Sequence, residues 1–416
     1  MKLLMNKNLA LLLSGQFVSQ IGDKFYMLAL AIWVLDTTNS PAMMGAVLFC
    51  SFFPTFLVGF IGGAFVDKYD RKIIIVAADL IRGLVIAGVA CLYFFNLLNI
   101  QAIFISQILL SVCAAFFNPA IPAVIPQIID KSQLAQANSM TSFVRGFSAM
   151  IGPILGGIAV ATLGYTAVFA FNALSFIISA AFECFLKIPS HRNKQIARAG
   201  IISNTIEGLK TIFRFRKLMI ILIMVAIIHF FVGSIEVIIP VFSSQLAGSG
   251  AKNLGYIQTF FGLGTVLTAL MISFYNIDGE EVRLLFGGVL AFGSVCLAIA
   301  YLSISGINSV MIYLGPFLLL GSFIILAATC FRTLLQKNIE NEMAGRVFGA
   351  AGTIGDISIP IAMLTYGFLL KLVSCSWLLA TTGVFLMLLS GIFYRSYRHI
   401  DVCEKGHLET DPEFIE

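Results

Sequence analysis

Charged residues are the scarcest class in this sequence. Only 11% of its 416 residues are Asp, Glu, Lys or Arg, whereas a soluble domain has about 25%. Hydrophobic residues make up 59% and include 38 Phe, and the mean hydropathy is +0.97. This composition excludes an ordinary soluble domain and predicts a chain that lies mostly within a lipid bilayer.

Signatures of cofactor chemistry are also missing. The eight cysteines include no Cys-x-x-Cys pair, and the four histidines lack the spacing of a metal site. No Gly-x-x-x-x-Gly-Lys-Ser/Thr occurs, so no ATP site is encoded. We therefore expect neither an enzyme nor a protein with a cofactor or metal, and we interpret the cysteines as small apolar residues inside helices.

Long apolar runs predict the fold. About 20 mainly apolar residues span a bilayer as a helix, and helices are expected because lipid offers no partner for free backbone groups. Turn formers and charges separate twelve such runs. The predicted fold is an all-α membrane protein with twelve transmembrane helices in two six-helix halves. The predicted helices cover 8–36, 41–66, 73–95, 100–128, 138–163, 166–188, 217–246, 252–276, 283–305, 308–337, 345–371 and 376–397.

Lysines and arginines gather in alternate connections. One set holds Lys2, Lys7, Lys68, Arg71, Lys72, Lys131, the basic residues of 189–217, Lys337, Arg346, Arg395 and Arg398, whereas the other holds little beyond Lys252 and Lys371. Because basic residues are retained in cytoplasmic loops, we expect a multi-pass protein of a bacterial-type inner or plasma membrane with both termini cytoplasmic. This asymmetry also explains the net charge of +5, so nucleic-acid binding is not needed. The first apolar run is too long for a cleavable signal peptide.

A single polar connection divides the chain. The expected units are an N-terminal half (1–188), a cytoplasmic linker (189–216), a C-terminal half (217–397) and a cytoplasmic tail (398–416). The stretch 201–216 is amphipathic, and it is either a helix on the inner membrane surface or an ordinary linker. A weak repeat relates Pro126-Gln127, Asp130 and Pro153 to Leu335-Gln336, Glu340 and Pro360. Transporters built from parallel repeats bind substrate between the halves.

The short charged segment 67–72 carries the most specific motif. It joins two long apolar runs and follows Gly63. It resembles the loop between the second and third helices of the major facilitator superfamily, whose pattern is Gly-x-x-x-Asp-Arg/Lys-x-Gly-Arg-Arg/Lys. The matching residues are Gly63, Asp67, Lys68, Arg71 and Lys72, and Asp70 replaces the second glycine. The resemblance implies that Asp67, with Arg71 as its cation, latches the cytoplasmic side against the start of a helix near Gly345-Arg346.

A second motif lies in the predicted helix over 138–163. Gly152, Pro153, Gly156 and Gly157 resemble the superfamily's antiporter motif Gly-Pro-x-x-Gly-Gly, although Ser139 and Ser148 stand where upstream glycines are usual. Small residues let helices approach closely, and proline can bend a helix. Simple helix packing is the alternative interpretation.

Further segments are similar to the macrolide-efflux and enterobactin-exporter-like branch of the superfamily. They are Gly22-Asp23, Ala78-Asp79-Leu80, Asn118-Pro119-Ala120 and Gly345-Arg346-Val347-Phe348-Gly349. The resemblance implies a secondary active transporter, a proton-coupled exporter of lipophilic, macrolide-like molecules that works as a monomer by alternating access. A lysophospholipid flippase, a siderophore exporter and a non-transporting scaffold remain alternatives. Without an ATP site, the energy must come from an ion gradient, a partner or the substrate's own gradient.

Ionisable residues within apolar runs are costly in a bilayer and are functional candidates by default. The candidates for coupling or substrate binding are Asp23, Arg145, Glu236 and Asp356. For Asp23, a structural pair with Lys24 or a facing arginine is an equal alternative. We interpret Asp79 and Arg82 as a structural pair on one helix face, and we expect Glu183 and Arg332 to extend to the membrane surface.

Aromatic residues could line a central cavity. The candidates are Phe25, Tyr26, Phe230, Phe231, Phe260 and Phe261. For each of them, ordinary packing against lipid or a neighbouring helix is the simpler interpretation.

Overall fold

The computed structural model consists of helices and short connections over the residues that it describes, which are 6–130, 133–188, 216–274, 279–337, 355 and 357–410. The first group of helices comprises α1 (Lys7–Thr38), α2 (Pro41–Lys68), α3 (Arg71–Phe94), α4 (Ile100–Ile128) and α5 (Leu134–Cys184). The second comprises α7 (Arg216–Gln245), α8 (Gly250–Phe274), α9 (Glu281–Ile304), α10 (Val310–Lys337) and α12 (Cys375–Thr410). A shorter apolar helix, Ile357–Leu369, precedes α12. Within this part of the chain, ten helices are long and apolar enough to cross a membrane.

Polar side chains cap the starts of several helices. The carboxamide of Asn6 accepts hydrogen bonds from the N–H groups of Asn8 and Leu9 at the start of α1. Asp70 likewise accepts the N–H of Lys72 at 2.8 Å at the start of α3, and Asn99 accepts that of Ala102 at the start of α4. These side chains satisfy N–H groups that have no partner within the helix. The residue that departs from the loop motif, Asp70, is thus the N-cap of α3.

Helix α5 consists of two passes. Its backbone is non-helical at Gly164, with φ 77° and ψ 176°, a conformation that favours glycine. Gly156, before the break, lies against the backbone of Phe25. Phe171, after the break, stacks on the ring of Phe25 at 5.2 Å. The two limbs therefore fold back along α1, as the predicted separation of 138–163 from 166–188 requires. The predicted total of twelve helices stays a prediction, because most of 338–356 lies outside the described residues.

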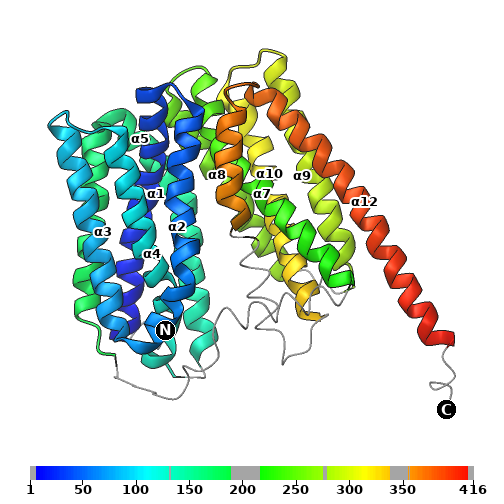
Figure 1. Ribbon diagram of the computed structural model, residues 1–416, viewed down its shortest axis with the longest axis horizontal. Coiled ribbons are helices and arrows are strands. Elements are labelled where there is room, and N and C mark those ends of the chain that lie inside the picture. The colour runs from blue at the N-terminus through cyan, green and yellow to red at the C-terminus, as the bar shows by residue number, and fades with distance from the viewer. Residues whose placement is uncertain are drawn as a thin grey trace.

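The helices form two bundles side by side, α1 to α5 and α7 to α12 (Figure 1). Helix α1 begins, and α12 ends, at the same face of the molecule (Figure 1). We name this the terminal face and the opposite one the far face. Helix α12 continues to Thr410, beyond its predicted end at 397. Of the predicted linker over 189–216, residues 189–215 lie outside the described residues, and Arg216 is the first residue of α7.

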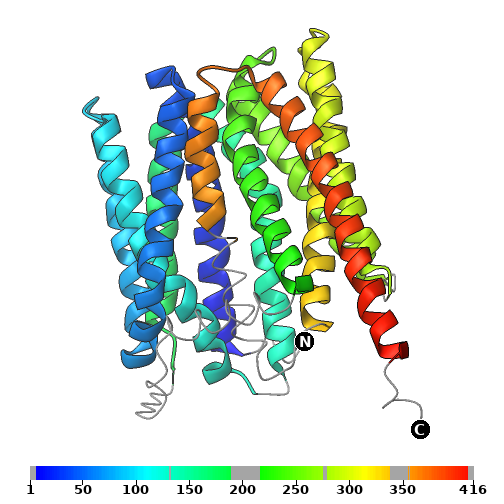
Figure 2. The same cartoon turned by 45° about the vertical axis from the view of Figure 1, so that its right-hand side comes forward.

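The two bundles meet through glycines. Gly157 of α5 packs against the backbone of Ala251 and Gly255 in α8. Gly45, near the start of α2, packs against Gly367, and the helix over Ile357–Leu369 lies beside α2 in Figure 2. Since α2 and α8 both start at the far face, these contacts bring the halves together on that side. Without side chains the backbones approach closely enough for extensive van der Waals contact.

Candidate functional site

A central group of charges lies between the halves. Asp23 and Lys24 are at mid-length of α1 and are exposed, although protein surrounds them. Glu236 of α7 is also exposed while lying deep within the molecule. Lys24 is close enough to interact electrostatically with both Asp23 and Glu236. These three residues, which we name the central site, therefore border an internal space that both halves share.

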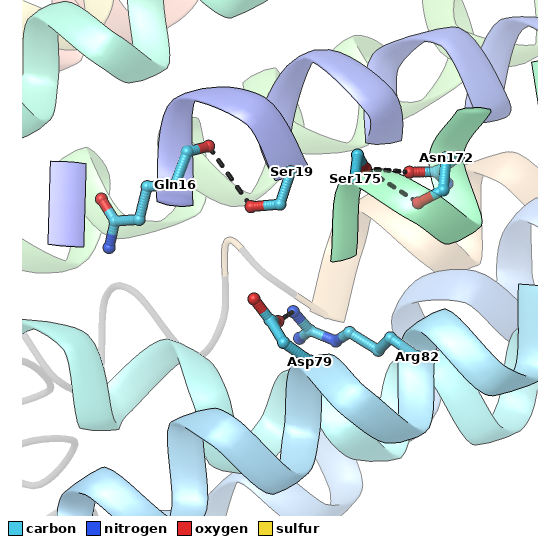
Figure 3. A network of polar contacts seen from close by, with 6 residues as sticks. All are labelled: Gln16, Ser19, Asp79, Arg82, Asn172 and Ser175. Atoms are coloured by element: carbon cyan, nitrogen blue, oxygen red, sulfur yellow. Dashed lines mark hydrogen bonds and ion pairs between the residues drawn. The ribbon is translucent and has the colours of Figure 1, made fainter. Parts of the chain in front are cut away.

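Asp23 also faces a second group of polar residues inside the N-terminal half. This group, the polar seam, lies where α1, α3 and the second limb of α5 meet (Figure 3). All its residues are at most 8% exposed. Its members are Gln16 and Ser19 of α1, Asp79 and Arg82 of α3, and Asn172, Ser175, Ser179 and Glu183 of α5.

Glycines of α1 make room for the seam. A side chain at Gly22 would collide with Ser175 and Asn172, and one at Gly15 would touch Ser179 at 3.0 Å. The four seam residues of α5 are spaced by three, four and four, so they share one face of that helix. The Gly22-Asp23 segment thus combines close packing with a carboxylate at the edge of the seam.

Arg82 is the cation of the seam. Its Nη1 donates to Oδ1 of Asp79 at 3.3 Å, and both side chains are almost completely buried. The guanidinium lies over the ring of Phe117 at 4.6 Å and near that of Phe176 at 5.6 Å, which adds cation–π attraction. Arg82 also interacts electrostatically with Asp23 and Glu183. The predicted Asp79–Arg82 pair is therefore present and extends to two further carboxyls.

The prediction for Glu183 was wrong. Proximity to the end of its helix suggested that the side chain extends to the membrane surface, but Glu183 is 0% exposed. Its location on the seam-facing side of α5 brings it close to Asp79 and Arg82. The packing of α1 and α3 against α5 covers this side, and hydropathy along one helix does not reveal such coverage. The same prediction for Arg332 stays untested, because its side chain lies outside the described part of the chain.

The antiporter-like glycines lie at two different contacts. Gly152 packs against Lys24, and Gly156 packs against Phe25, so both face α1. Gly157 faces α8, where the carbonyl of Pro153 approaches Gly255. Of the two serines upstream, Ser148 is completely buried, and the side chain of Ser139 lies outside the described part. Gly152 thus lies beside Lys24 of the central site, and Gly157 lies at the contact between the two halves.

The signature loop is described only in part. Its backbone closes α2 at Lys68 and opens α3 at Arg71. Arg71 donates from Nη1 to the carbonyl of Ala123 in α4 at 2.8 Å, and Lys72 is half-buried. The surroundings of Gly63, the side chains of Asp67 and Lys68, and the segment that holds Arg346 lie outside the described part of the chain, so the latch stays a prediction.

The two remaining charged candidates are Arg145 and Asp356, and only Arg145 lies within the described residues. Arg145 is exposed on α5, and within the described residues no hydrogen bond or ion pair joins it to Asp23. Asp356 lies outside the described residues. Its neighbour Gly355 packs against the ring of His229.

The aromatic candidates serve mainly as packing. Phe25, Tyr26 and Phe231 are at most 8% exposed, and Phe230, Phe260 and Phe261 pack around the same core. The hydroxyl of Tyr26 accepts a hydrogen bond from Nε2 of Gln107 at 2.6 Å. The simpler interpretation therefore fits these residues better than a cavity lining does.

A cavity of about 310 Å³ opens at the far face between the halves. In the cavity wall formed by the N-terminal half, the hydroxyl of Tyr165 donates a hydrogen bond to Oδ2 of Asp36 at 2.7 Å. The cavity is lined by Ile32, Leu35, Asp36, Val160, Ala161 and Tyr165 from one half and by Pro240, Ser243, Ser244, Ser249, Gly250 and Ala251 from the other. Sequence reasoning missed it, because its walls come from four separate helix ends.

The fold and the charges between the halves agree with the sequence comparisons. The family model for the Major Facilitator Superfamily matches residues 12–363. The chain belongs to the Major Facilitator Superfamily. It is therefore a multi-pass membrane transporter and not an enzyme.

Several curated superfamily proteins are similar along most of their length. An uncharacterised MFS-type transporter of Bacillus subtilis, YfiS, is 26% identical over 92% of this chain and 91% of its own. Macrolide efflux protein A of Streptococcus pyogenes is 22% identical over 84% and 86%. The staphyloferrin A transporter of Staphylococcus aureus is 23% identical over 81% of each chain.

Solved structures share the superfamily fold at low identity. The nucleoside transporter NupG superposes with a TM-score of 0.76 at 12% identity, covering 94% of this chain and 99% of its own. The peptide transporter PepTSo gives a TM-score of 0.72 at 12% identity, covering 94% and 98%. The two-bundle architecture of the superfamily is thus present, as the sequence predicted.

Proposed function

We propose that this superfamily member is a proton-coupled exporter of lipophilic small molecules that works by alternating access in a bacterial plasma membrane. In this proposal both termini are cytoplasmic, so the terminal face is the cytoplasmic face. The observation that carries the proposal is the central site, in which Asp23 and Lys24 of one half share an internal space with Glu236 of the other.

Charged groups at mid-membrane are costly and are retained for a function. Because Lys24 and Glu236 belong to different halves, a rocking motion of the halves changes their separation. A carboxylate that loses its cation in one state favours taking up a proton in that state. The central site can therefore couple proton binding to the change of access.

Glycine contacts support closure at the far face. Gly157 against α8 and Gly45 against Gly367 allow the halves to meet there. We assign the antiporter-like motif to this contact and the signature loop, with Asp67 and Arg71, to closure of the cytoplasmic side. Ligands shift such an equilibrium by binding one state better than the other.

The lipophilic substrate class is supported by similarity to macrolide efflux protein A over most of the chain. A siderophore exporter is the second candidate. Similarity to the staphyloferrin A transporter and the cationic Lys24 in the central site favour it, because a carboxylate-rich chelator would pair with that ammonium group.

Purified protein in liposomes with an imposed pH gradient tests both candidates. Macrolides, lipophilic dyes, lysophospholipids and a citrate-type siderophore should be assayed in parallel. We expect gradient-driven movement of macrolides or dyes, reduced in Glu236→Gln and unchanged in Glu280→Gln, whose carboxylate is exposed at the start of α9. Movement of lysophospholipid alone would identify a flippase instead, and movement of the siderophore alone would identify the second candidate.

A further inference from the structure

The polar seam contains buried groups that the central site does not use. Glu183 is completely enclosed, and neither of its carboxyl oxygens has a hydrogen-bond partner among the described residues. In the same seam, Oε1 of Gln16 and Nδ2 of Asn172 also lack partners there. Because buried polar groups are almost always hydrogen-bonded, so many unpaired polar atoms in one place require an explanation.

The charges of the seam do not balance. Asp79, Glu183 and Asp23 all interact with a single guanidinium, that of Arg82. Lys24 is the second cation near Asp23, but Glu236 shares it. Burying a carboxylate without its own cation is strongly unfavourable. A carboxylic acid avoids that cost and brings its own hydrogen-bond donor.

Glu183 is the carboxyl most in need of a proton. Asp79 has the direct contact with Arg82 at 3.3 Å, and Asp23 is exposed to the internal space. Glu183 has neither advantage. Among the described residues, the charged groups that interact directly with Glu183 are Asp79 and Arg82 of α3. Asp23 of α1 and Cys113 of α4 interact in turn with Asp79 and Arg82, and Lys24 interacts with Asp23.

We propose that Glu183 binds and releases the coupling proton, and that Arg82 transmits its protonation state to Asp23 in the central site. The inference rests on the proposed proton-coupled function and assigns the proton to the seam. With the O–H bond of Glu183 intact, Arg82 balances Asp79 and Asp23. When that proton passes to water at one face, the new carboxylate draws Arg82 away from Asp23. A proton from water at the other face re-forms the O–H bond and restores the first arrangement.

The seam offers polar groups along this route. Gln16 and Ser19 on α1, and Asn172 and Ser175 on α5, lie between mid-length of α1 and the end of α5 (Figure 3). Ser179, one turn after Ser175, lies against Gly15 of α1. Hydroxyl and amide side chains both donate and accept hydrogen bonds, so they can hold water and pass a proton. The C-terminal half has apolar residues at the positions of α9 that match Asp79 and Arg82, namely Val289 and Phe292.

Transport in liposomes tests the assignment, with a radiolabelled macrolide as the probe. In Glu183→Gln we expect loss of gradient-driven accumulation, while exchange of labelled for unlabelled macrolide without a gradient continues. Glu183→Asp should keep gradient-driven transport, and Glu280→Gln should match the wild type. Retained accumulation in Glu183→Gln would overturn the assignment. Equal loss in Glu183→Asp and Glu183→Gln would overturn it as well, because a titratable carboxyl at this position would then not preserve coupling.

Infrared spectroscopy of the purified protein gives a readout that needs no transport. At neutral pH, the wild type should show the carbonyl band of a protonated carboxylic acid, and Glu183→Gln should lack it. A band that persists in Glu183→Gln, or that is absent from the wild type, would contradict the inference. A wild type that moves no probe in response to the gradient would overturn the proposed function and the coupling role together, while the infrared band would still show whether Glu183 holds a proton.

Discussion

The two halves use one framework but bury different residues. Helices α3 and α9 are each the third helix of their half, and each has 24 residues. Their ninth residues are Asp79 and Val289, and their twelfth are Arg82 and Phe292; all four are buried. In the N-terminal half these positions form the polar seam. In the C-terminal half they line an apolar cavity of about 20 Å³ together with Leu386 of α12.

This difference separates folding from function. Apolar packing is sufficient to hold α9 against its neighbours, so the framework does not need charges at these positions. Buried ion pairs are weak contributors to stability compared with apolar residues of similar size. The charges of the polar seam are therefore better explained by what the protein does than by how it folds. The comparison can be tested in four ways, given from the largest expected effect to the smallest.

Removing the cation of the seam should have the largest effect. Arg82→Ala leaves buried carboxyls without a partner and should destabilise the protein by about 3–5 kcal/mol, seen as a lower thermal unfolding temperature in detergent. The double variant Asp79→Val with Arg82→Phe copies α9 and should recover part of this loss.

Arg283→Ala is the matched control. Its pair with Glu280 at 3.7 Å is exposed, and exposed pairs contribute little, so the unfolding temperature should not change. A double variant less stable than Arg82→Ala would show that the N-terminal half cannot accept the apolar pattern of its counterpart.

The signature loop belongs to the N-terminal half only. Asp67→Asn should lower transport several-fold while the affinity for the transported compound survives, because breaking a latch shifts conformational populations rather than removing a binding group. The two quantities are measured as initial transport rate in liposomes and as equilibrium binding in detergent. Glu280→Gln, just before α9, provides the control, and unchanged transport in Asp67→Asn would rule out the latch.

Helix crossings in the two halves should respond differently to an added methyl group. A Cβ at Gly264 of α8 would collide with the backbone carbonyl of Leu318, whereas one at Gly22 of α1 would meet the side chains of Ser175 and Asn172. Side chains can rotate away and a helix backbone cannot, so Gly264→Ala should destabilise more, with both losses within about 1–3 kcal/mol.

Gly88 and Gly287 serve as controls, because among the described residues no atom outside the adjacent turns of the same helix lies within 4 Å of the position that an added methyl group would take there. Their alanine variants should unfold at the same or a higher temperature, because alanine favours helix by about 1 kcal/mol. Equal losses in Gly22→Ala and Gly264→Ala would contradict the distinction between side-chain and backbone contacts.

The caps of α3 and α9 should show the smallest effect. Asp70 accepts a hydrogen bond from the N–H of Lys72, whereas Glu280 makes no side-chain cap at the start of α9. Asp70→Ala should therefore cost about 1 kcal/mol and Asp70→Gly a few tenths, with no change in Glu280→Ala. Thermal unfolding in detergent measures all three, and equal effects of Asp70→Ala and Glu280→Ala would refute the capping role.

Much of the fold could be predicted from local sequence. Apolar runs located the helices because each residue's transfer into lipid depends mainly on its own side chain. Gly164 marked the break in α5 because its positive φ favours glycine. Asp23 and Glu236 stood out because charges are rare within such runs.

The neighbours of those charges could not be predicted in the same way. Lys24 approaches Glu236 only because the two halves pack together, and Glu183 is enclosed only because α1 and α3 cover its side of α5. The sequence by itself determined a helical membrane transporter of this superfamily, through hydropathy and a short charged motif. The tertiary structure alone decided which buried charges share one guanidinium, because such contacts depend on helix rotation and packing, which hydropathy along the chain does not encode.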